Sequence, residues 1–168
     1  ETQIEKRTML IDVVTVISRL LTRHGNRVGA MMFGNKIQHT IPARGGRLQV
    51  LRLVNDMLNQ PRLAKSSITN LKSFLTGALN SIKRRSLVFI ISDFISEPGW
   101  EKPLSLLAQR HEVLAIRLTD PRELELPDVG MVLMEDAETG EQLFVDTHDK
   151  KFRKRFAEAA QKREQELN

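Results

Sequence analysis

Two residues at the end of an apolar segment are of types that can do chemistry. Ser92 and Asp93 directly follow residues 87–91, which are Leu, Val, Phe, Ile and Ile. An apolar run of this length is typical of a strand covered on both faces of a parallel sheet. In open α/β sheets, ligands bind beyond the carboxyl ends of the strands. Asp93 is therefore a candidate functional carboxylate, and the alternative is a helix-cap or turn residue, since Asp is common at both.

A second polar segment precedes the strongest helical pattern. Residues 66–70 are Ser, Ser, Ile, Thr and Asn, and any of their hydroxyl groups would suit the N-cap of the helix that follows. Hard cations also take oxygen ligands from Ser, Thr and Asp side chains. Thr69 and Asp93 are therefore the candidate metal ligands, and capping is the alternative role for Thr69.

Other patterns that would indicate catalysis are not found in the sequence. The four histidines, at positions 24, 39, 111 and 148, have no metal-ligand spacing, so we interpret them as structural or solvated. The chain contains neither a phosphate-binding glycine loop nor a nucleophile elbow. We therefore predict no catalytic residue, no cofactor-binding residue, and a binding module rather than an enzyme.

An alternative class remains open. A metal held by Asp93 would suit a phosphoesterase, and the net charge of +5 would attract a polyanion, as in a nucleic-acid-binding domain. Against this, no general base accompanies Asp93 in the sequence, and one Trp with no Tyr offers little for base stacking. We therefore expect a protein partner and no nucleic acid.

The elements that position these residues follow from hydrophobic periodicity. A helix is predicted through Leu21, closed by Gly25, and strands are predicted at 28–33, 36–41, 87–91 and 113–118. Pro42 is expected to end the second of these strands. Further helices are predicted around 50–58, 71–82 and 104–109, a β-hairpin near 131–145, and a charged surface helix at 150–167.

Alternation of strands and helices predicts an α/β fold with a mainly parallel sheet and helices on both faces. The strands 28–33, 87–91 and 113–118 should share that sheet, in a single domain spanning residues 1–168. The side chains of Leu10, Ile17, Phe74, Leu75 and Leu79 should be buried. A helix opens the chain, whereas in a doubly wound fold a helix follows a strand, so we expect a fragment of a longer protein that lacks its first strand.

Composition limits the remaining possibilities. The 168 residues are 40% hydrophobic and 28% charged, an ordinary globular balance. The chain has no Cys, which excludes disulfides and fits a reducing compartment, so we expect a cytoplasmic protein. No apolar run reaches the roughly 20 residues that a membrane-spanning helix needs.

Several segments together resemble one bacterial family, called domain of unknown function 58. They are Asn26-Arg27-Val28-Gly29, then Pro42-Ala43-Arg44-Gly45-Gly46, Ile91-Ser92-Asp93-Phe94, the run from Arg117 to Gly130, and Glu135 to Gly140 followed by Val145-Asp146-Thr147. The resemblance covers nearly the whole chain.

This resemblance implies a Rossmann-like, von Willebrand factor A-like three-layer sandwich with a metal-ion-dependent adhesion site that binds Mg²⁺. Its three parts are an Asp-x-Ser-x-Ser motif, a Thr matched by Thr69, and an Asp matched by Asp93. No aspartate of this chain is followed by the serine pattern, so the site is incomplete. The family also implies a MoxR-type AAA+ ATPase as partner, in the assembly or maturation of other proteins.

Overall fold

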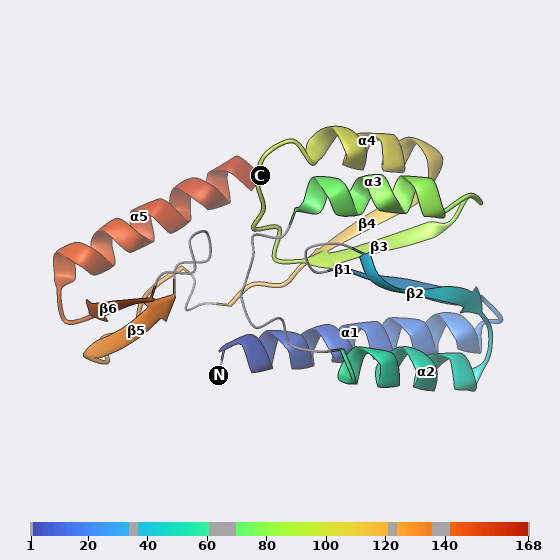
Figure 1. Cartoon of the computed structure of the whole chain (residues 1–168), viewed down its shortest axis with the longest axis horizontal. Helices are drawn as coiled ribbons and strands as arrows, with labels where there is room; N and C mark the ends of the chain where they lie inside the picture. Colours follow the sequence, from blue (N-terminus) through green and yellow to red (C-terminus); the bar gives the residue numbers. More distant parts are fainter. Residues whose placement is uncertain (1, 34–36, 61–69, 121–123, 136–141, 168) are drawn as a thin grey trace. The chain divides into compact units, whose positions relative to one another are not determined.

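The computed structural model describes residues 2–33, 37–60, 70–120, 124–135 and 142–167 of a mixed α/β chain (Figure 1). Thr69, one of the predicted metal ligands, and the turn predicted at 34–35 lie outside these residues. The chain divides into two compact units, Glu1–Ala64 with Ile68–Leu118, and Lys65–Ser67 with Thr119–Asn168. Each unit is described by itself.

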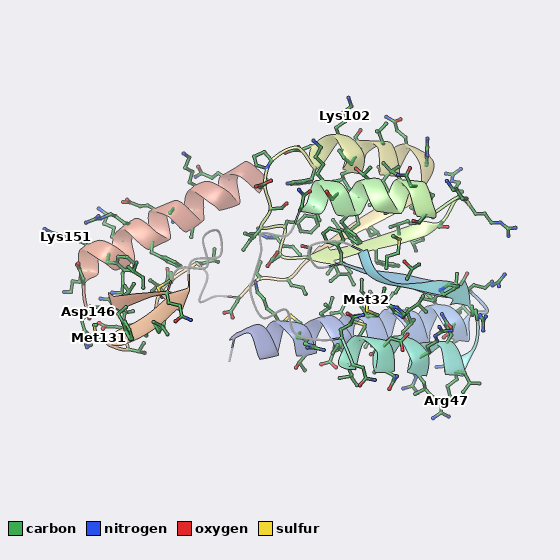
Figure 2. All side chains as sticks on the ribbon, viewed as in Figure 1. Met32, Arg47, Lys102, Met131, Asp146 and Lys151 are labelled. Atoms are coloured by element: carbon green, nitrogen blue, oxygen red, sulfur yellow. The ribbon has the colours of Figure 1, made fainter. Side chains whose placement is uncertain are left out.

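The first unit alternates helices and strands. In chain order its elements are α1 (Thr2–Arg23), β1 (Val28–Phe33), β2 (Ile37–Arg44), α2 (Arg47–Leu58), α3 (Leu71–Ser81), β3 (Leu87–Ser92), α4 (Glu101–Arg110) and β4 (Glu112–Arg117). Helices α1 and α2 lie along one side of this unit and α3 and α4 along the other, with the strands between them (Figure 1). Charged side chains such as Arg47 and Lys102 extend outward from these helices (Figure 2).

The strands of this unit form two separate pairs. β1 pairs with β2 in antiparallel orientation, and β3 pairs with β4 in parallel orientation, in register from Leu87 opposite Glu112 to Ser92 opposite Arg117. In the part of the chain that the structure describes, β1 and β3 are not hydrogen-bonded to each other. The prediction that strands 28–33, 87–91 and 113–118 share one sheet is therefore wrong for this structure, because a cavity separates β1 from β3.

Strand β2 continues past the proline that was expected to end it. Val28 is opposite Arg44 and Ala30 is opposite Ile41, so two residues of β2, one of them Pro42, face the single residue Gly29. This is a β-bulge, where the ladder is locally interrupted. Proline is tolerated there because a bulge does not require its backbone N–H.

Helix ends follow local chemistry. Gly25 has a φ of 79° and its N–H donates to the Thr22 carbonyl, while the Asn26 N–H donates to the Leu21 carbonyl at 3.0 Å. This double hydrogen bond confirms Gly25 as the residue that ends α1. At the start of α3 the cap is the side-chain oxygen of Asn70, which accepts from the Ser73 N–H at 2.8 Å, rather than a hydroxyl.

The best-buried part of the first unit lies where helices meet strands. Leu53, Leu75 and Leu107 are at most 1% exposed, and Ile41 is 2% exposed. Helix α2 confirms the helix predicted around 50–58, and its apolar side chains are only partly covered. Val50 and Met57 are buried as expected, whereas Leu51 and Leu58 point into solvent and Gln49 is buried.

The second unit contains β5 (Met131–Glu135), β6 (Gln142–Asp146) and α5 (Lys150–Leu167). The two strands form the predicted antiparallel hairpin, with Val132 opposite Val145 and Leu133 opposite Phe144. Helix α5 lies beside this hairpin (Figure 1), and it has the bounds that the charge pattern predicted. Val145 and Ala160 are buried, whereas Phe144 is 72% exposed, so only one face of the hairpin is covered within this unit.

Candidate functional site

Asp93 directly follows the carboxyl end of β3, where the sequence predicts a functional carboxylate. Its Oδ1 accepts a hydrogen bond from the Ile95 N–H at 3.1 Å, and the Ser92 hydroxyl oxygen accepts one from the Phe94 N–H at 3.1 Å. Both bonds reach two residues ahead, the pattern by which Asp and Ser side chains stabilise a turn. Asp93 therefore stabilises the turn through Oδ1, and its other carboxylate oxygen, Oδ2, takes no part in these two bonds.

Strained backbone marks the same turn. Phe94 has a φ of 60°, which is unusual for a bulky residue with a side chain. Its ring is 8% exposed and lies 5.8 Å from the ring of Trp100, so packing holds the residue in this conformation. Such strain costs about 1–3 kcal/mol and is concentrated at functional sites. The turn after β3 is thus the part of this unit where backbone geometry itself indicates a site.

Two cations from distant elements surround Asp93. The ammonium group of Lys6, in α1, lies 3.4 Å from Oδ2, and the Arg117 Nε donates to the Asp93 carbonyl at 3.4 Å. The side chains of Lys6 and Asp93 are 19% and 35% exposed, so the ion pair is partly shielded from water. Sequence reasoning did not identify either cation, because neither position is near Asp93 in the chain.

The described residues around Asp93 do not fit a magnesium ion. Oδ1 is used by the turn and Oδ2 faces a positive charge, whereas Mg²⁺ requires near-octahedral oxygen ligands at about 2.0–2.1 Å. Within the described ranges, no group of three or more His, Asp or Glu side chains is arranged to hold a metal ion. The predicted pairing of Thr69 with Asp93 as ligands lies outside what the structure describes.

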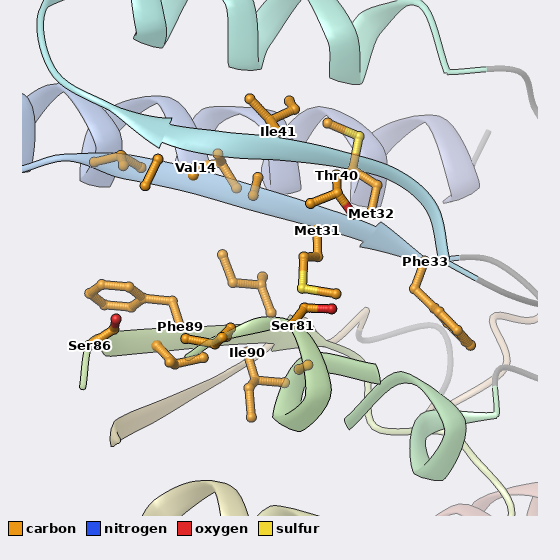
Figure 3. Close-up of a pocket in the computed structure, with 18 of the residues that line it drawn as sticks. Val14, Met31, Met32, Phe33, Thr40, Ile41, Ser81, Ser86, Phe89 and Ile90 are labelled. Carbon is orange, nitrogen blue, oxygen red and sulfur yellow. The ribbon is translucent and has the colours of Figure 1, made fainter. Parts of the chain in front are cut away.

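A cavity of about 740 Å³ separates β1 from β3 (Figure 3). The two strands border it over their whole length, α1 lines one face, and α3 lines the other. Met31 extends from β1 toward α3 (Figure 3). The Phe33 ring lies 5.0 Å from the ring of Phe74. Most of the lining residues are apolar, and the polar ones include Ser18, Thr40 and Ser81.

The cavity explains why part of the predicted core is only half-buried. Leu75 is 1% exposed as expected, but Leu10, Ile17, Phe74 and Leu79 are intermediate in exposure. All of these except Leu79 line the cavity. Its volume falls within the roughly 300–1,000 Å³ of ligand pockets. This volume therefore suits a binding site better than a packing defect.

The second unit has a cluster of its own. The Asp128 carboxylate is hydrogen-bonded to His148 and lies 2.9 Å from the Arg153 guanidinium. The hydrogen bond from His148, and then the charges of Arg153 and His148, lower the pKa of Asp128 below its ordinary value. Thr147, fully buried, accepts from the Val129 N–H at 3.0 Å and donates to the Gly130 carbonyl at 2.7 Å. These contacts join the segment before β5 to the turn after β6.

Three of the four histidines contact hydrogen-bonding groups of the protein. His39 lies 3.1 Å from the Asp56 carboxylate, a ring nitrogen of His24 lies 2.8 Å from the Leu20 carbonyl oxygen, and His148 contacts Asp128. His111 is 6% exposed, and neither of its ring nitrogens has a hydrogen-bond partner among the described residues.

Comparison with known proteins places the chain among bacterial sequences. Two relatives, uncharacterized proteins of Mycobacterium tuberculosis and Mycobacterium bovis, are each 36% identical over 136 residues, which are 81% of this chain and 43% of the relative. An uncharacterized protein of Mycobacterium avium is 40% identical over 120 residues, 71% of this chain and 70% of that protein. The chain thus spans less than half the length of the first two relatives.

No solved structure matches the chain. Among the helices that the structure describes, none combines the length and the apolar character needed to cross a bilayer. The family model described as "Protein of unknown function DUF58" matches residues 1–166, and the chain therefore belongs to the DUF58 family.

Proposed function

We propose that this chain is a protein–protein interaction module of the metal-ion-dependent adhesion type, not an enzyme, and that the turn at Asp93 is its contact site. The observation that carries the proposal is the position of Asp93. It follows the carboxyl end of a parallel strand, in a strained turn, with one carboxylate oxygen facing a cation from another element. Crevices at this edge of an α/β sheet are where such folds bind ligands.

The proposal includes the finer fold. We propose a von Willebrand factor A-like three-layer sandwich with a mainly parallel central sheet, although β1–β2 and β3–β4 are separate pairs in this structure. The alternation of elements, the parallel pair β3–β4 and the helices on two sides support it. In that fold the family site binds Mg²⁺ through an Asp-x-Ser-x-Ser motif that this chain does not contain. The contact that we assign to the chain itself is the Asp93 carboxylate with its neighbouring cations.

The partner that we propose is a MoxR-type AAA+ ATPase, with the module acting in assembly or maturation of other proteins. Support comes from the family resemblance rather than from the geometry of the site. Asp93 and Lys6 already form an ion pair. A partner group that binds either side chain must therefore replace the interaction that these two side chains make with each other. A cation from the partner would bind Asp93, and a carboxylate would bind Lys6.

The experiment compares Asp93→Ala with Asp12→Ala, a change at an exposed carboxylate on α1 in the same unit. Each variant is mixed with a purified MoxR-type AAA+ ATPase, and complex formation is measured by sedimentation velocity with and without Mg²⁺. We expect Asp93→Ala to weaken the complex at least tenfold and Asp12→Ala to leave it unchanged. Equal binding by both variants would refute a contact site at Asp93.

The second candidate, a metal-dependent phosphoesterase or a nucleic-acid-binding domain, is favoured by the charge of +5. Its test is the salt dependence of binding to a labelled oligonucleotide. Neutralisation of several phosphates makes such binding fall steeply between about 50 and 200 mM salt. Tight, steeply salt-dependent binding, or hydrolysis of a phosphodiester with added Mg²⁺, would favour this candidate over the interaction module.

A further inference from the structure

Positive charge is unevenly distributed along the chain. Of the 26 Lys and Arg residues, 18 lie in residues 1–118, together with only 8 of the 21 Asp and Glu residues. This segment, which holds every helix and strand of the first unit, therefore has ten more basic than acidic side chains, twice the excess of the whole chain. The first unit is thus much more basic than the net charge of +5 indicates.

Eight of the basic side chains gather at the edge of the first unit where β1, β3 and β4 begin. Helices α1, α3 and α4 and strand β2 end at this edge, and α2 begins there (Figure 1). We call it the basic edge, and its basic residues are Arg23, Arg27, Arg44, Arg47, Arg110 and the run 83–85. All eight side chains are exposed, and none of them forms an ion pair with an acidic residue that the structure describes.

Backbone contacts hold the segments of the basic edge together. In the β1–β2 ladder, Arg44 is opposite the first residue of β1, so Arg27 and Arg44 lie next to each other at the end of the ladder. On the other strand pair, the Glu112 N–H donates to the Ser86 carbonyl at 3.0 Å, which joins the turn before β3 to the end of α4. Arg27 and Arg84 both line the cavity, so the two groups of cations share one edge. Among the described residues of this edge, Glu112 is the one with an acidic side chain.

Stabilisation of helices accounts for only part of this charge. Arg23, Arg110 and residues 83–85 lie in or just after the last turns of helices, where cations interact favourably with the helix dipole. Arg47, by contrast, is the first residue of α2, and no acidic residue offsets it in that turn. A cation at the N-terminus of a helix is unfavourable, and like charges gathered at one edge repel one another. The folded state by itself therefore does not explain the basic edge.

Large apolar side chains are exposed among these cations. Leu48, in the first turn of α2, is 81% exposed, and Leu20, in the last turn of α1, and Leu87, at the start of β3, are exposed as well. A single exposed leucine needs no explanation, but these three alternate with basic residues along one edge. The single tryptophan, Trp100, precedes α4 and lies at the opposite edge of the unit. The basic edge thus combines cations with aliphatic rather than aromatic side chains.

This combination distinguishes between the polyanions that could bind. Single-stranded nucleic acid takes much of its affinity from stacking on aromatic rings, which leucines do not provide. Duplex nucleic acid would bind the cations but leave the leucines against its charged backbone. The surface of an anionic bilayer offers phosphate groups to Lys and Arg and, just beneath them, an apolar layer to aliphatic side chains.

We propose that the basic edge docks onto the surface of an anionic lipid bilayer, with Leu20, Leu48 and Leu87 inserted below the lipid phosphate groups. The attraction is screened over roughly 8 Å at physiological salt, so the side chains of this edge dominate the binding. Asp93 follows the other end of β3 and therefore faces away from the bilayer. The proposal adds a membrane surface to the proposed protein contact and does not rest on it.

The first experiment is co-sedimentation of the full chain with lipid vesicles. Vesicles of phosphatidylcholine alone are compared with vesicles that also contain about 30% phosphatidylglycerol, an anionic lipid. We expect binding to the anionic vesicles only, weakened at least tenfold between about 50 and 300 mM salt. Equal binding to both kinds of vesicle, or binding to neither, would overturn the proposal.

Charge reversal at two edges tests where the vesicle binds. Arg47→Glu combined with Arg85→Glu changes the basic edge, and Lys72→Glu combined with Lys102→Glu makes the same change of net charge in the first turns of α3 and α4, at the opposite edge (Figures 1 and 2). Glu is favourable in the first turn of a helix, so these variants should fold. We expect the first pair to lower the partition coefficient at least tenfold and the second by less than about twofold. Equal losses would overturn the assignment to the basic edge.

A leucine pair on one helix separates a bilayer from other polyanions. Leu48→Gln lies at the basic edge, and Leu58→Gln, its control, is exposed at the other end of α2. We expect Leu48→Gln to lower vesicle binding by about threefold or more and Leu58→Gln to leave it unchanged. Tighter binding to a labelled oligonucleotide than to anionic vesicles, with no effect of Leu48→Gln on either, would overturn the proposal in favour of a nucleic acid. All these variants keep Asp93, so this proposal and the proposed function can fail separately.

Discussion

Adding a single methyl group at Gly29, in β1, should measurably lower the free energy of unfolding. A Cβ at this position would lie 2.7 Å from the Ile41 carbonyl oxygen and 2.9 Å from the Ala43 backbone nitrogen. An ordinary contact needs at least 3.4 Å, so Gly29→Ala forces β2 to move by about 0.7 Å. The clashing atoms are backbone atoms of the bulge, and they cannot rotate away.

The magnitude follows from two opposing effects. Overpacking of this kind costs about 1–3 kcal/mol. Replacing Gly by Ala also restricts the unfolded chain, which returns about 0.4–1 kcal/mol. We therefore expect Gly29→Ala to lower the free energy of unfolding by about 1–2 kcal/mol, which corresponds to a fall in Tm of roughly 2–8 °C for a chain of this size.

The assay is urea unfolding followed by the fluorescence of Trp100, the single tryptophan, which lies in the same unit as Gly29. The matched control is Gly45→Ala, where the nearest atom to a new Cβ is the Asn26 carbonyl oxygen at 3.8 Å and the backbone is outside the left-handed region. This control should be neutral or slightly stabilising. If the two variants unfold at the same urea concentration, the close approach of β1 and β2 at the bulge is incorrect.

Three further predictions concern buried polar groups and one ion pair. Gln49 is 4% exposed, and its side chain donates to carbonyls of β1 and β2 at 2.8 and 2.9 Å. Gln49→Leu should therefore lower the free energy of unfolding by about 1–3 kcal/mol, and Gln161→Leu, at an exposed position, should hardly change it. Equal urea midpoints for the two variants would contradict this. His111→Leu should leave the free energy of unfolding unchanged or raise it, because both ring nitrogens are buried without a hydrogen-bond partner among the described residues. A loss above about 1 kcal/mol would show that they have one. The pKa of Asp128, measured by carboxyl-carbon NMR, should lie below 3.8, and His148→Ala should raise it toward that ordinary value. A lowered pKa stabilises the folded state only while the carboxylate is ionised. The stability that Asp128 contributes should therefore be present at neutral pH and lost as the pH falls through its pKa. An unchanged Asp128 titration in the variant would exclude His148 as the main cause.

Much of the local structure could be predicted from the sequence because local chemistry decides it. Helix α1 ends at Gly25 since glycine adopts the positive φ that closes a helix. Strand β1, the hairpin β5–β6 and helix α5 agree with the predictions because period-2 and period-3.6 patterns are local properties of the chain. Pro42 was misjudged because a bulge, created by the opposite strand, removes the need for its N–H.

The sequence alone determined that the chain is mixed α/β, that Asp93 follows a buried-type strand, and that most helices and strands lie where periodicity places them. Only the tertiary structure decided which strand edges pair, because β1 and β3 are both mainly apolar and nothing local tells which neighbour each accepts. The same holds for the site. Lys6 and Asp93 are 87 positions apart, and they meet because α1 begins at the edge of the unit where β3 ends. Contacts of this kind depend on how whole elements pack, and no spacing within either segment encodes them.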